Sequence, residues 1–560
     1  MRAMSGLFSG APSLLNARIV PATLLAFPFL SPLVAGPSAN AWQLLVTWLC
    51  AAALWWIGPR ALPSRGVLLW LAALALAIVV RRGSDTAQVL GAFTAIAAVA
   101  MAACVGAGVA RTPGSAWPTA FAWGLLGAGL VSAVLGLCQY YGAAAPLAPF
   151  TTAPEIGQAY GNLRQRNQFA TLISMALAAA LWLYGGLGPR WRRCGWAALL
   201  LLTLAAAAST SRTGLLQWLA ISGGAAALAW SERRGAAAGA ARRLPHPLAL
   251  LALVPAYFLA AWALPMLAGP EIEDMLRRLR DGAPEGHGRL LLWGNVLELI
   301  AQRPWLGWGW GELSYAHFTH PYAGPRFVEI LDNAHNLPLQ LAVELGVPAA
   351  VALCVGFAAL VLSARPWRAR DPLQLLAWAV LGAIGLHSLL EYPLWYGPFQ
   401  LVFGLCLGLL WPGVAGRTRW PASVLAGSAV AAWLVAVVGY AGWDYLRISQ
   451  VYTVRAERLP PWRDDTLAKA QGSWLFAGQV RFAELSLTTV TRANAAEAHA
   501  LAQRVLHFSP EPRVVSRLVE SATLLGRDDE ALALAGRFKA AYPDEYARWI
   551  KGEPLEAPAD

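Results

Sequence analysis

Long runs of apolar residues, separated by short polar stretches, fill the chain from about residue 19 to residue 440. The runs are roughly 17–25 residues long, the length that an α-helix needs to cross the hydrocarbon core of a bilayer. We count thirteen of them, within a range of 12–14. The pattern predicts an all-α polytopic membrane protein.

The predicted spans have approximate ends, because short loops blur the boundaries between neighbouring runs. They lie near residues 19–35, 41–58, 66–80, 88–109, 118–142, 168–186, 194–209, 213–230, 247–266, 336–362, 373–389, 394–411 and 421–440. The N-terminus carries no clear cleavable signal peptide, so the first run is expected to remain as a span.

The chain changes character after the last span. Residues 441–560 are charged, have a periodic pattern of Ala and Leu, and contain no run long enough to span a bilayer. The stretch "EPRVVSRLVESATLLGRDDEALALAGRFKAAYPDEY" predicts two helices joined at Gly526-Arg527, with an acidic start to the second. It resembles one helical-hairpin repeat of the tetratricopeptide (TPR) kind, or a small helical cap.

These changes divide the chain into three predicted parts. N-terminal transmembrane helices occupy residues 1–145, and a transmembrane core that carries the candidate catalytic residues occupies 146–440. The core includes a large loop at about 267–335, and residues 441–560 form a small soluble helical domain.

Composition agrees with the membrane class. Hydrophobic residues make up 57% of the chain and charged residues only 13%, about half of what a soluble protein carries. In such a chain the net charge of +12 indicates topology, and we expect no nucleic-acid partner. The six cysteines are scattered, without the spacing of a disulfide framework or a zinc site.

Arginine is concentrated in alternate short loops, which orients the spans. With the N-terminus inside, the cytoplasmic loops hold Arg60, Arg65, Arg111, Arg190, Arg192, Arg193, Arg233, Arg234, Arg242, Arg243, Arg365, Arg368, Arg370, Arg417 and Arg419. The opposite short loops hold only Arg81, Arg82, Arg164, Arg166 and Arg212. An odd number of spans then places the large loop and the C-terminal domain on the outer, non-cytoplasmic face of the membrane.

Five polar segments fall on that same non-cytoplasmic side. They are "YGNLRQRNQFAT" with Arg164, Arg166 and Asn167; "STSRTG" with Arg212; "EGHGRLLLW" with His287 and Arg289; "DNAHNLPLQLAVELG" with Asp332, His335 and Asn336; and "HSLLEYPLWY" with His387 and Glu391. The four-residue spacing of His387 and Glu391 predicts one shared helix face, with Pro393 ending the helix.

The arginines in these segments have two interpretations. Arginines near span ends often snorkel to the interface or anchor the helix. Here they lie on the side that the orientation rule depletes, and ionisable groups at membrane depth usually mark a ligand or a pathway. Because Arg suits bidentate phosphate contacts, arginines from separate segments predict a site for a diphosphate.

His335 is the candidate general base, because a histidine can take a proton near neutral pH. Asp332 or Asn336 would orient its ring, and Glu391 is the reserve candidate for the base. No paired carboxylates of the DxD kind and no evident metal cage are present, so we expect chemistry without a metal or another cofactor. Trp308 and Trp310, in "GWGWGEL", either stack on a sugar or anchor the chain at the membrane interface.

Four stretches of the chain carry a resemblance to a known family. "IGQAYGNLRQRNQFATL", "SRTGLL", "GRLLLWGNVLELIAQRPWLGWGWGEL" and "NAHNLPLQLAVELGVPA" resemble, in order, motifs of the bacterial O-antigen ligases and polymerases (the Wzy_C group). "YGNLRQRNQFAT" and "HSLLEYPLWYGPF" are more similar to the PglL-type O-linked protein glycosylation ligases. The specific motifs cover roughly residues 150–400, and the tail resembles that subgroup loosely.

The resemblance implies a donor and a reaction. The donor would be an oligosaccharide on undecaprenyl diphosphate, and the glycan would move en bloc to a hydroxyl group. The membrane would be a bacterial inner membrane, with the donor, the active site and the C-terminal domain on its periplasmic face. By motif, Arg212 and Arg289 would bind the diphosphate and His335 would activate the acceptor. Arg164 and Arg166 fit the glycosylation-ligase motif.

The acceptor stays open at this point. The first reading is transfer to Ser or Thr of periplasmic proteins such as pilins. The alternatives are an O-antigen ligase acting on lipid A-core, a polysaccharide polymerase, or, in a different class, a transporter or flippase for lipid-linked sugars. A flippase would also need the arginines, whereas His335 and the external tail favour an enzyme.

Overall fold

A computed structural model describes residues 12–38, 40–112, 114–235, 243–269, 288–414 and 420–555, with the backbone alone at 12–17 and 420–423. Within these ranges the chain forms helices and no β-strand beyond two isolated bridges. The helices up to the large loop are α2 (Pro12–Leu30), α3 (Ala41–Ile57), α4 (Arg65–Val80), α5 (Thr86–Arg111), α6 (Trp117–Tyr140), α7 (Arg166–Tyr184), α8 (Pro189–Ala208), α9 (Arg212–Gly235), α10 (Pro247–Leu251) and α11 (Leu253–Ala268).

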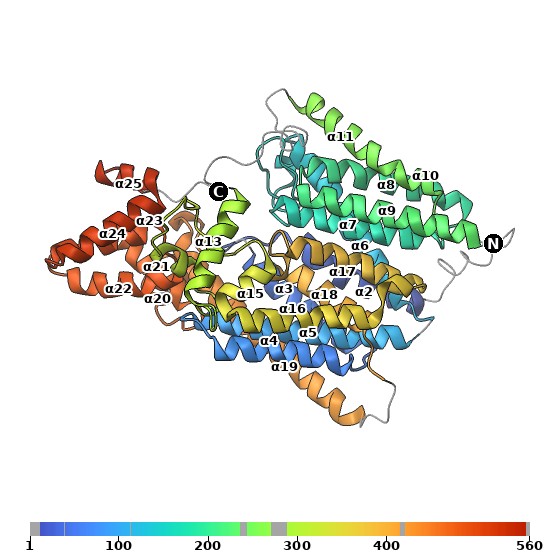
Figure 1. Cartoon of the computed structure of the whole chain (residues 1–560), viewed down its shortest axis with the longest axis horizontal. Coiled ribbons are helices and arrows are strands. Elements are labelled where there is room, and N and C mark those ends of the chain that lie inside the picture. Colours follow the sequence, from blue (N-terminus) through green and yellow to red (C-terminus); the bar gives the residue numbers. More distant parts are fainter. Residues whose placement is uncertain are drawn as a thin grey trace.

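The remaining helices belong to the large loop, the last spans and the tail. They are α13 (Arg289–Gln302), α14 (Leu313–Thr319), α15 (Leu337–Leu345), α16 (Val347–Ala364), α17 (Pro372–Ser388), α18 (Gly397–Leu410), α19 (Trp420–Ser449), α20 (Thr466–Ala470), α21 (Ala477–Leu487), α22 (Ala495–Phe508), α23 (Pro512–Leu524), α24 (Asp528–Ala541) and α25 (Pro543–Ile550). The long helices lie side by side, and the tail helices lie beyond one end of them, at the left of Figure 1.

Each of the thirteen ranges expected to span holds a helix. Six segments of the described chain are long and apolar enough to cross a membrane, and several other helices are apolar but shorter. The multi-pass membrane class therefore stands, while the count of thirteen stays a prediction. Several boundaries differ from expectation: the run at 336–362 is broken at Gly346, the run at 247–266 is divided into α10 and α11, and α19 continues past residue 440 to Ser449.

The break at Gly346 has a steric reason. Gly346 has a φ of +91°, which a residue with a side chain rarely adopts. A Cβ at this position would lie 2.3 Å from the carbonyl oxygen of Trp305. The chain therefore turns between α15 and α16, and α15 lies against the large loop instead of lengthening the span.

Glycines on α5 and α18 bring these two helices into close contact. A Cβ on Gly408 would lie 1.9 Å from the carbonyl oxygen of Ala103, and one on Gly404 would lie 2.5 Å from that of Val99. From the other side, a Cβ on Gly106 would lie 2.2 Å from the carbonyl oxygen of Leu405. Gly404 and Gly408 form a GxxxG pair, the pattern that lets helix backbones approach in membranes.

The arginine-rich loops meet at the end of the bundle opposite the tail. Residues Pro63 and Pro412 form an isolated bridge, and Arg111 donates a hydrogen bond to the carbonyl oxygen of Gly413. A Cβ on Gly185 would lie 3.2 Å from the carbonyl oxygen of Arg243. This grouping is what the loop pattern of the sequence predicted, although Arg242, Arg417 and Arg419 lie outside the described residues.

Arg81 and Arg82 were exceptions to the loop pattern, and their contacts explain them. The Arg81 side chain donates to the carbonyl oxygen of Gly307 at 3.0 Å, and its own carbonyl accepts from the Trp310 amide at 2.7 Å. Arg82 forms an isolated bridge with Trp310. These arginines therefore hold the large loop against the turn between α4 and α5.

The large loop and the tail share apolar cores. One core joins α13 to α14, α15 and the segment before His335, through Leu292, Val296, Leu313 and Ala334. A second core joins α21–α25 and includes Phe318 of α14, which is 2% exposed. Helix α14 thus belongs to both, so the tail packs directly on the loop that carries candidate site residues.

Candidate active site

Four helices begin around one polar centre, at the tail end of the bundle. They are α7, α9, α13 and α15, whose first residues are Arg166, Arg212, Arg289 and Leu337. A helix N-terminus presents free backbone N–H groups and a partial positive charge, which favours anions. The backbone alone therefore prepares this region for a negatively charged ligand, and three of the four helices begin with an arginine.

Glu391 joins these helices. Its Oε1 accepts a hydrogen bond from Nδ2 of Asn167 at 3.0 Å and pairs with the guanidinium of Arg289. Its Oε2 lies 2.8 Å from Nδ1 of His335. The Glu391 side chain is only 4% exposed, whereas those of Arg289 and His335 are 38% and 27% exposed. A buried carboxylate thus holds a cation and an imidazole that both face open space.

The partner of His335 sets the protonation of its ring. An ionised carboxylate can only accept, so Nδ1 of His335 carries the proton and Nε2 is left as an acceptor. Burial, and secondarily the Arg289 cation, lower the pKa of His335 from 6.5 to about 4, so the ring is neutral near pH 7. The Tyr392 ring lies edge-on to the imidazole, with centroids 4.9 Å apart. The arrangement suits a general base oriented by a carboxylate.

The predicted orienters of His335 were wrong. Asn336 caps α15, accepting from the Leu339 amide at 3.1 Å, and donates to the carbonyl oxygen of Leu389 at 3.0 Å. Asp332 is exposed, and no described contact joins it to the imidazole. Glu391 orients the imidazole of His335, and Asn336 instead fixes the segment that carries Glu391.

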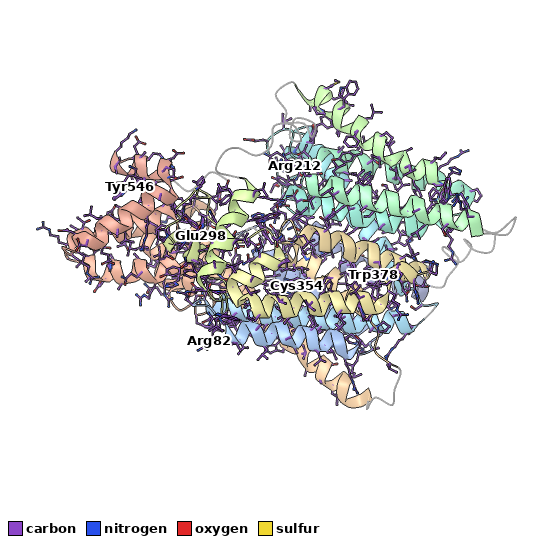
Figure 2. The ribbon with its side chains drawn as sticks, in the orientation of Figure 1. Arg82, Arg212, Glu298, Cys354, Trp378 and Tyr546 are labelled. Atoms are coloured by element: carbon purple, nitrogen blue, oxygen red, sulfur yellow. The ribbon has the colours of Figure 1, made fainter. Side chains whose placement is uncertain are left out.

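The segment with Arg166 and Asn167 lies beside the start of α9. Oδ1 of Asn167 accepts from the Ser211 hydroxyl at 2.6 Å, and Arg166 donates to the Thr210 hydroxyl at 3.4 Å. Arg212, the next residue, is exposed and lies at the end of its helix in Figure 2. The structure therefore brings the segments that carry Arg166, Arg212 and Arg289 to one centre.

Arg164 faces a different way. Its guanidinium donates to the carbonyl oxygens of Pro32 and Leu33, both at 3.3 Å. These contacts tie the segment before α7 to the end of α2. They indicate that Arg164 fixes the loop, and its predicted contact with the ligand is not supported by these bonds.

His387 and Glu391 do not share a helix face as predicted. Helix α17 ends at Ser388, five residues before Pro393, and Glu391 lies beyond it. The His387 ring is fully buried and lies 2.8 Å from the Thr171 hydroxyl. His387 therefore packs against α7 from within α17, buried but close enough to Arg289 and His335 to interact with them electrostatically.

The two tryptophans have protein partners. Nε1 of Trp308 donates to the carbonyl oxygen of Leu299 at 3.0 Å, and Arg303 lies over its ring at 4.0 Å. Trp310 stacks on Trp395 with centroids 6.1 Å apart. Both help to hold the large loop, and sugar stacking stays a prediction. His287 lies outside the described residues.

Three residues around the centre adopt a left-handed backbone. Arg164, Thr210 and His335 have φ values of +56°, +48° and +49°. A non-glycine residue pays about 1–2 kcal/mol for such a conformation, and a β-branched residue such as Thr210 pays most. Only two other non-glycine residues in the described chain share it, so strain gathers where the four helices begin.

Gln139, a residue that the sequence analysis passed over, supports this centre from α6. Its Nε2 donates to the Thr151 hydroxyl and to the carbonyl oxygens of Thr152 and Gly161, at 3.0–3.2 Å. Its Oε1 accepts from the amides of Tyr160 and Gly161, at 3.1 and 2.7 Å. A fully buried glutamine thus fixes the loop that leads to Arg166, and an isolated Gln in an apolar run was the only signal.

In the part of the chain that the structure describes, no group of three or more His, Cys, Asp or Glu side chains is arranged to hold a metal ion. The Glu391 carboxylate is already paired with Arg289 and His335, and the other polar groups at the centre are cations, an imidazole and amides. This set of donors suits an anionic ligand better than a cation.

Three family models match the chain. Residues 159–184 match "Protein glycosylation ligase", 197–354 match "O-Antigen ligase", and 375–554 match "Virulence factor membrane-bound polymerase, C-terminal". The first two matches contain Arg166, Arg212, Arg289 and His335, and the third contains Glu391. These matches support a place for the chain in the O-antigen ligase superfamily.

One curated relative of the chain is a "General O-oligosaccharyltransferase" of Acinetobacter baylyi (strain ATCC 33305 / BD413 / ADP1). It is 29% identical over 171 residues, a match that covers 28% of this chain and 29% of the relative. The match spans less than a third of either protein. Together the comparisons support a membrane-bound glycosyltransferase of the ligase type and confirm the resemblance drawn from the motifs.

Proposed function

We propose that the chain is an O-oligosaccharyltransferase that moves a glycan en bloc from undecaprenyl diphosphate to Ser or Thr hydroxyls of periplasmic proteins such as pilins. The observation that carries the proposal is the position of Glu391, which contacts His335, Arg289 and Asn167 at once. A base and a phosphate-binding cation are thereby fixed side by side, as transfer from a diphosphate to a hydroxyl requires.

In the proposed reaction His335 accepts the proton of the acceptor, and the arginines stabilise the leaving group. The acceptor oxygen attacks the anomeric carbon while the bond from that carbon to the diphosphate oxygen breaks. The acceptor proton passes to Nε2 of His335, and Glu391 stabilises the imidazolium that forms. The departing undecaprenyl diphosphate takes the bonding electrons, and Arg289, Arg212 and Arg166 stabilise its charge. A single displacement inverts the anomeric configuration and leaves no covalent glycosyl-enzyme.

The helix N-termini contribute to the same step. Backbone N–H groups at the starts of α7, α9 and α13 add partial positive charge where negative charge grows on the leaving group. Because these groups are fixed in place by the fold, they need no reorganisation during the reaction. The protein supplies enough positive charge for the proposed step to need no metal ion, and EDTA should leave the rate unchanged.

A second candidate acceptor follows from one comparison. The match of residues 375–554 to a model described as a membrane-bound polymerase favours a growing glycan as the acceptor. Transfer to lipid A-core would be a third outcome of the same chemistry. The donor and the roles of His335 and Arg289 would be identical in all three.

The proposal is tested by reconstituting the full chain in liposomes with an undecaprenyl-diphosphate oligosaccharide. A pilin, lipid A-core and a second lipid-linked glycan are offered as acceptors in separate reactions. We expect glycosylated pilin from the wild type and a loss of roughly 10²–10⁴ in rate from His335→Ala, with donor binding kept. His246→Ala, an exposed histidine at the arginine-rich end, is the matched control.

Three outcomes would contradict the proposal. Full activity of His335→Ala would show that His335 is not the base. Retention of the anomeric configuration in the product would exclude a single displacement. Movement of the donor across the bilayer without transfer to any acceptor would favour the transporter. Product on lipid A-core or on the glycan alone would keep the chemistry and change the acceptor.

A further inference from the structure

A cavity of about 910 Å³ lies between α7, α9 and α17, on the side of the candidate site that faces the arginine-rich loops. Its walls are apolar, with Leu181 from α7, Leu228 from α9, and Leu375 and Trp378 from α17. Figure 2 shows Trp378 well away from Arg212 along the bundle. The volume is at the upper end of the range of about 300–1,000 Å³ that is usual for small-molecule sites.

The cavity is long. It is lined by Gln217 at one end of α9 and by Glu232 near the other. At a rise of 1.5 Å per residue these positions are about 22 Å apart along the helix. One leaflet of a bilayer has a hydrocarbon thickness of about 15 Å, so the cavity is long enough for a chain from a single leaflet.

The end of the cavity at the arginine-rich loops is basic. Arg18, Arg243 and Arg370 line it, with Glu232 as the acidic neighbour. Nε of Arg18 is buried and has no hydrogen-bond partner among the described residues. The Leu244 amide donates a hydrogen bond of 3.4 Å to the Glu232 carboxylate, which meets part of the hydrogen-bonding capacity of that group. This end therefore carries a net positive charge and suits a phosphate group.

The opposite end is separated from the candidate site by hydrogen bonds. Gln217 donates to the Thr171 hydroxyl and to the carbonyl oxygen of Ala383, both at 2.9 Å, and so joins α9 to α7 and α17. Thr171 in turn contacts His387, which is fully buried. A lipid whose diphosphate lay at Arg289 would have to send its chain through this layer.

We propose that the cavity binds an anionic glycerophospholipid of the leaflet next to the arginine-rich loops. Its phosphate lies at Arg18, Arg243 and Arg370, and an acyl chain fills the space between α7, α9 and α17. Basic pockets between transmembrane helices recognise anionic headgroups in this way. The site is distinct from the candidate active site and independent of the proposed reaction.

Retention of lipid by the purified full-length protein tests the headgroup site. The protein is stripped with detergent, incubated with phosphatidylglycerol or phosphatidylcholine, and examined by native mass spectrometry. We expect the wild type to retain phosphatidylglycerol, and Arg18→Gln/Arg243→Gln/Arg370→Gln to lose that preference on the order of tenfold or more. The matched control is Arg190→Gln/Arg193→Gln/Arg368→Gln, which removes three arginines near the same end that do not line the cavity.

Substitutions at two glycines test the part of the cavity that is proposed to hold the acyl chain, and each has a matched control. Gly224 and Gly382 line the cavity, and a Cβ on either would meet open space, so Gly224→Leu and Gly382→Leu should fill it without a clash. Gly223 and Gly385 lie on the same helices, also face open space, and do not line the cavity. The filled variants should lose phosphatidylglycerol, and Gly223→Leu and Gly385→Leu should keep it.

The proposal fails if the filled and control variants retain the same amount of phosphatidylglycerol. It also fails if the wild type retains phosphatidylglycerol and phosphatidylcholine equally well. A photoreactive polyprenyl diphosphate is incubated in parallel. If filling the cavity abolishes its cross-linking and leaves phosphatidylglycerol retention unchanged, the occupant is a polyprenyl chain and the assignment to a glycerophospholipid is wrong. Equal thermal midpoints among the glycine variants would confirm that each one folds.

Discussion

Among single residues, Glu391 has the contacts with the largest consequences. It orients His335 through Oε2 and holds Arg289 through Oε1. Replacing it by Gln keeps the shape but removes the charge that stabilises an imidazolium and favours one ring tautomer. We expect Glu391→Gln to lower kcat by roughly 10²–10⁴ in the reconstituted assay.

The control for this substitution lies in the same loop region. Glu298 pairs with His320 at 2.8 Å, outside the four-helix centre. Glu298→Gln should leave kcat within about twofold, because its histidine does not face the site. Equal losses from both variants would indicate a general effect on the loop and would contradict a specific role for Glu391.

The pH dependence of transfer follows from the same neighbours. Burial and Arg289 lower the pKa of His335 to about 4. A base works in its neutral form, so activity is full above this pKa and falls as the pH drops through it. We expect kcat/KM to be flat between pH 8 and about pH 6 and to decline tenfold per unit only below about pH 4. A decline that starts near pH 6.5 would show an unperturbed histidine.

At this scale the sequence named the residues of the candidate site better than it named their contacts, while their chemical roles stay a proposal. His335, Arg212 and Arg289 were named from motifs, and the structure brings their segments together. The partner of His335 was missed because Glu391 is 56 residues away in the chain. The neighbours Asp332 and Asn336 were chosen by sequence proximity, whereas the backbone of His335 turns through a left-handed conformation and directs the ring elsewhere.

At the scale of elements, the contact between α5 and α18 depends on the absence of side chains. A Cβ on Gly408 would lie 1.9 Å from a backbone oxygen, so Gly408→Val forces the two helices apart. Overpacking of this kind costs about 1–3 kcal/mol. The thermal midpoint of the detergent-solubilised protein should fall. Gly127→Ala, where a Cβ on α6 would meet open space, should leave the midpoint unchanged or raise it.

Gln139 offers a test of the loop that leads to α7. Gln139→Leu has a similar size but would leave up to five polar groups of residues 151–161 without partners. Each unsatisfied buried group costs about 1–3 kcal/mol. We expect a lower thermal midpoint, faster proteolysis within 141–165 and a higher KM for the donor.

Gln43→Leu is the matched control for this substitution. Gln43 is equally buried, on α3, and its Nε2 has no described hydrogen-bond partner. Its replacement should be neutral or stabilising. If both variants behaved alike, the hydrogen bonds of Gln139 would not be what fixes the loop.

Helices were predicted well where the length of an apolar run determines them. They were predicted less well where the backbone conformation of a single residue ends or divides a helix. Helices occupy all thirteen expected ranges. The division at Gly346 was missed because the run was extended across Glu344, Gly346 and Pro348, although a Gly and a Pro so close together favour a helix boundary. The end of α17 at Ser388 was misplaced because Pro393 was taken as the terminator, while the chain leaves the helix one turn earlier.

For the whole molecule, the arginine-rich loops lie at one end of the bundle and the candidate site at the other. The positive-inside rule then predicts opposite sides of the membrane for Arg368 and the tail. In a cysteine-free background, Arg368→Cys should react with a membrane-impermeant thiol reagent only from the cytoplasm. Leu532→Cys, at an exposed tail position, should react only from the periplasm. Labelling of both from one side would overturn the orientation.

The tail and the large loop form one unit at the site end. Phe318 of α14 inserts into the core of the tail, and Nδ1 of His507 in α22 lies 2.9 Å from Glu312 at the start of α14. Glu312 also accepts from the Ser84 amide at 2.6 Å. The other side of α14 packs in the core that holds α13 and the segment before His335. Loosening the tail should therefore disturb Arg289 and His335 even though no residue of the site is substituted.

Phe318→Ala is the substitution that tests this coupling. Truncating a buried Phe costs about 3–5 kcal/mol, and here the loss falls on the contact between tail and loop. We expect the tail to become sensitive to protease while the membrane helices stay intact, and transfer to fall at least tenfold as the loop loses its support. Phe150→Ala, at a position 71% exposed, is the control and should keep full activity. A Phe318→Ala protein with a protease-sensitive tail and undiminished transfer would show that the site is held by the membrane helices alone.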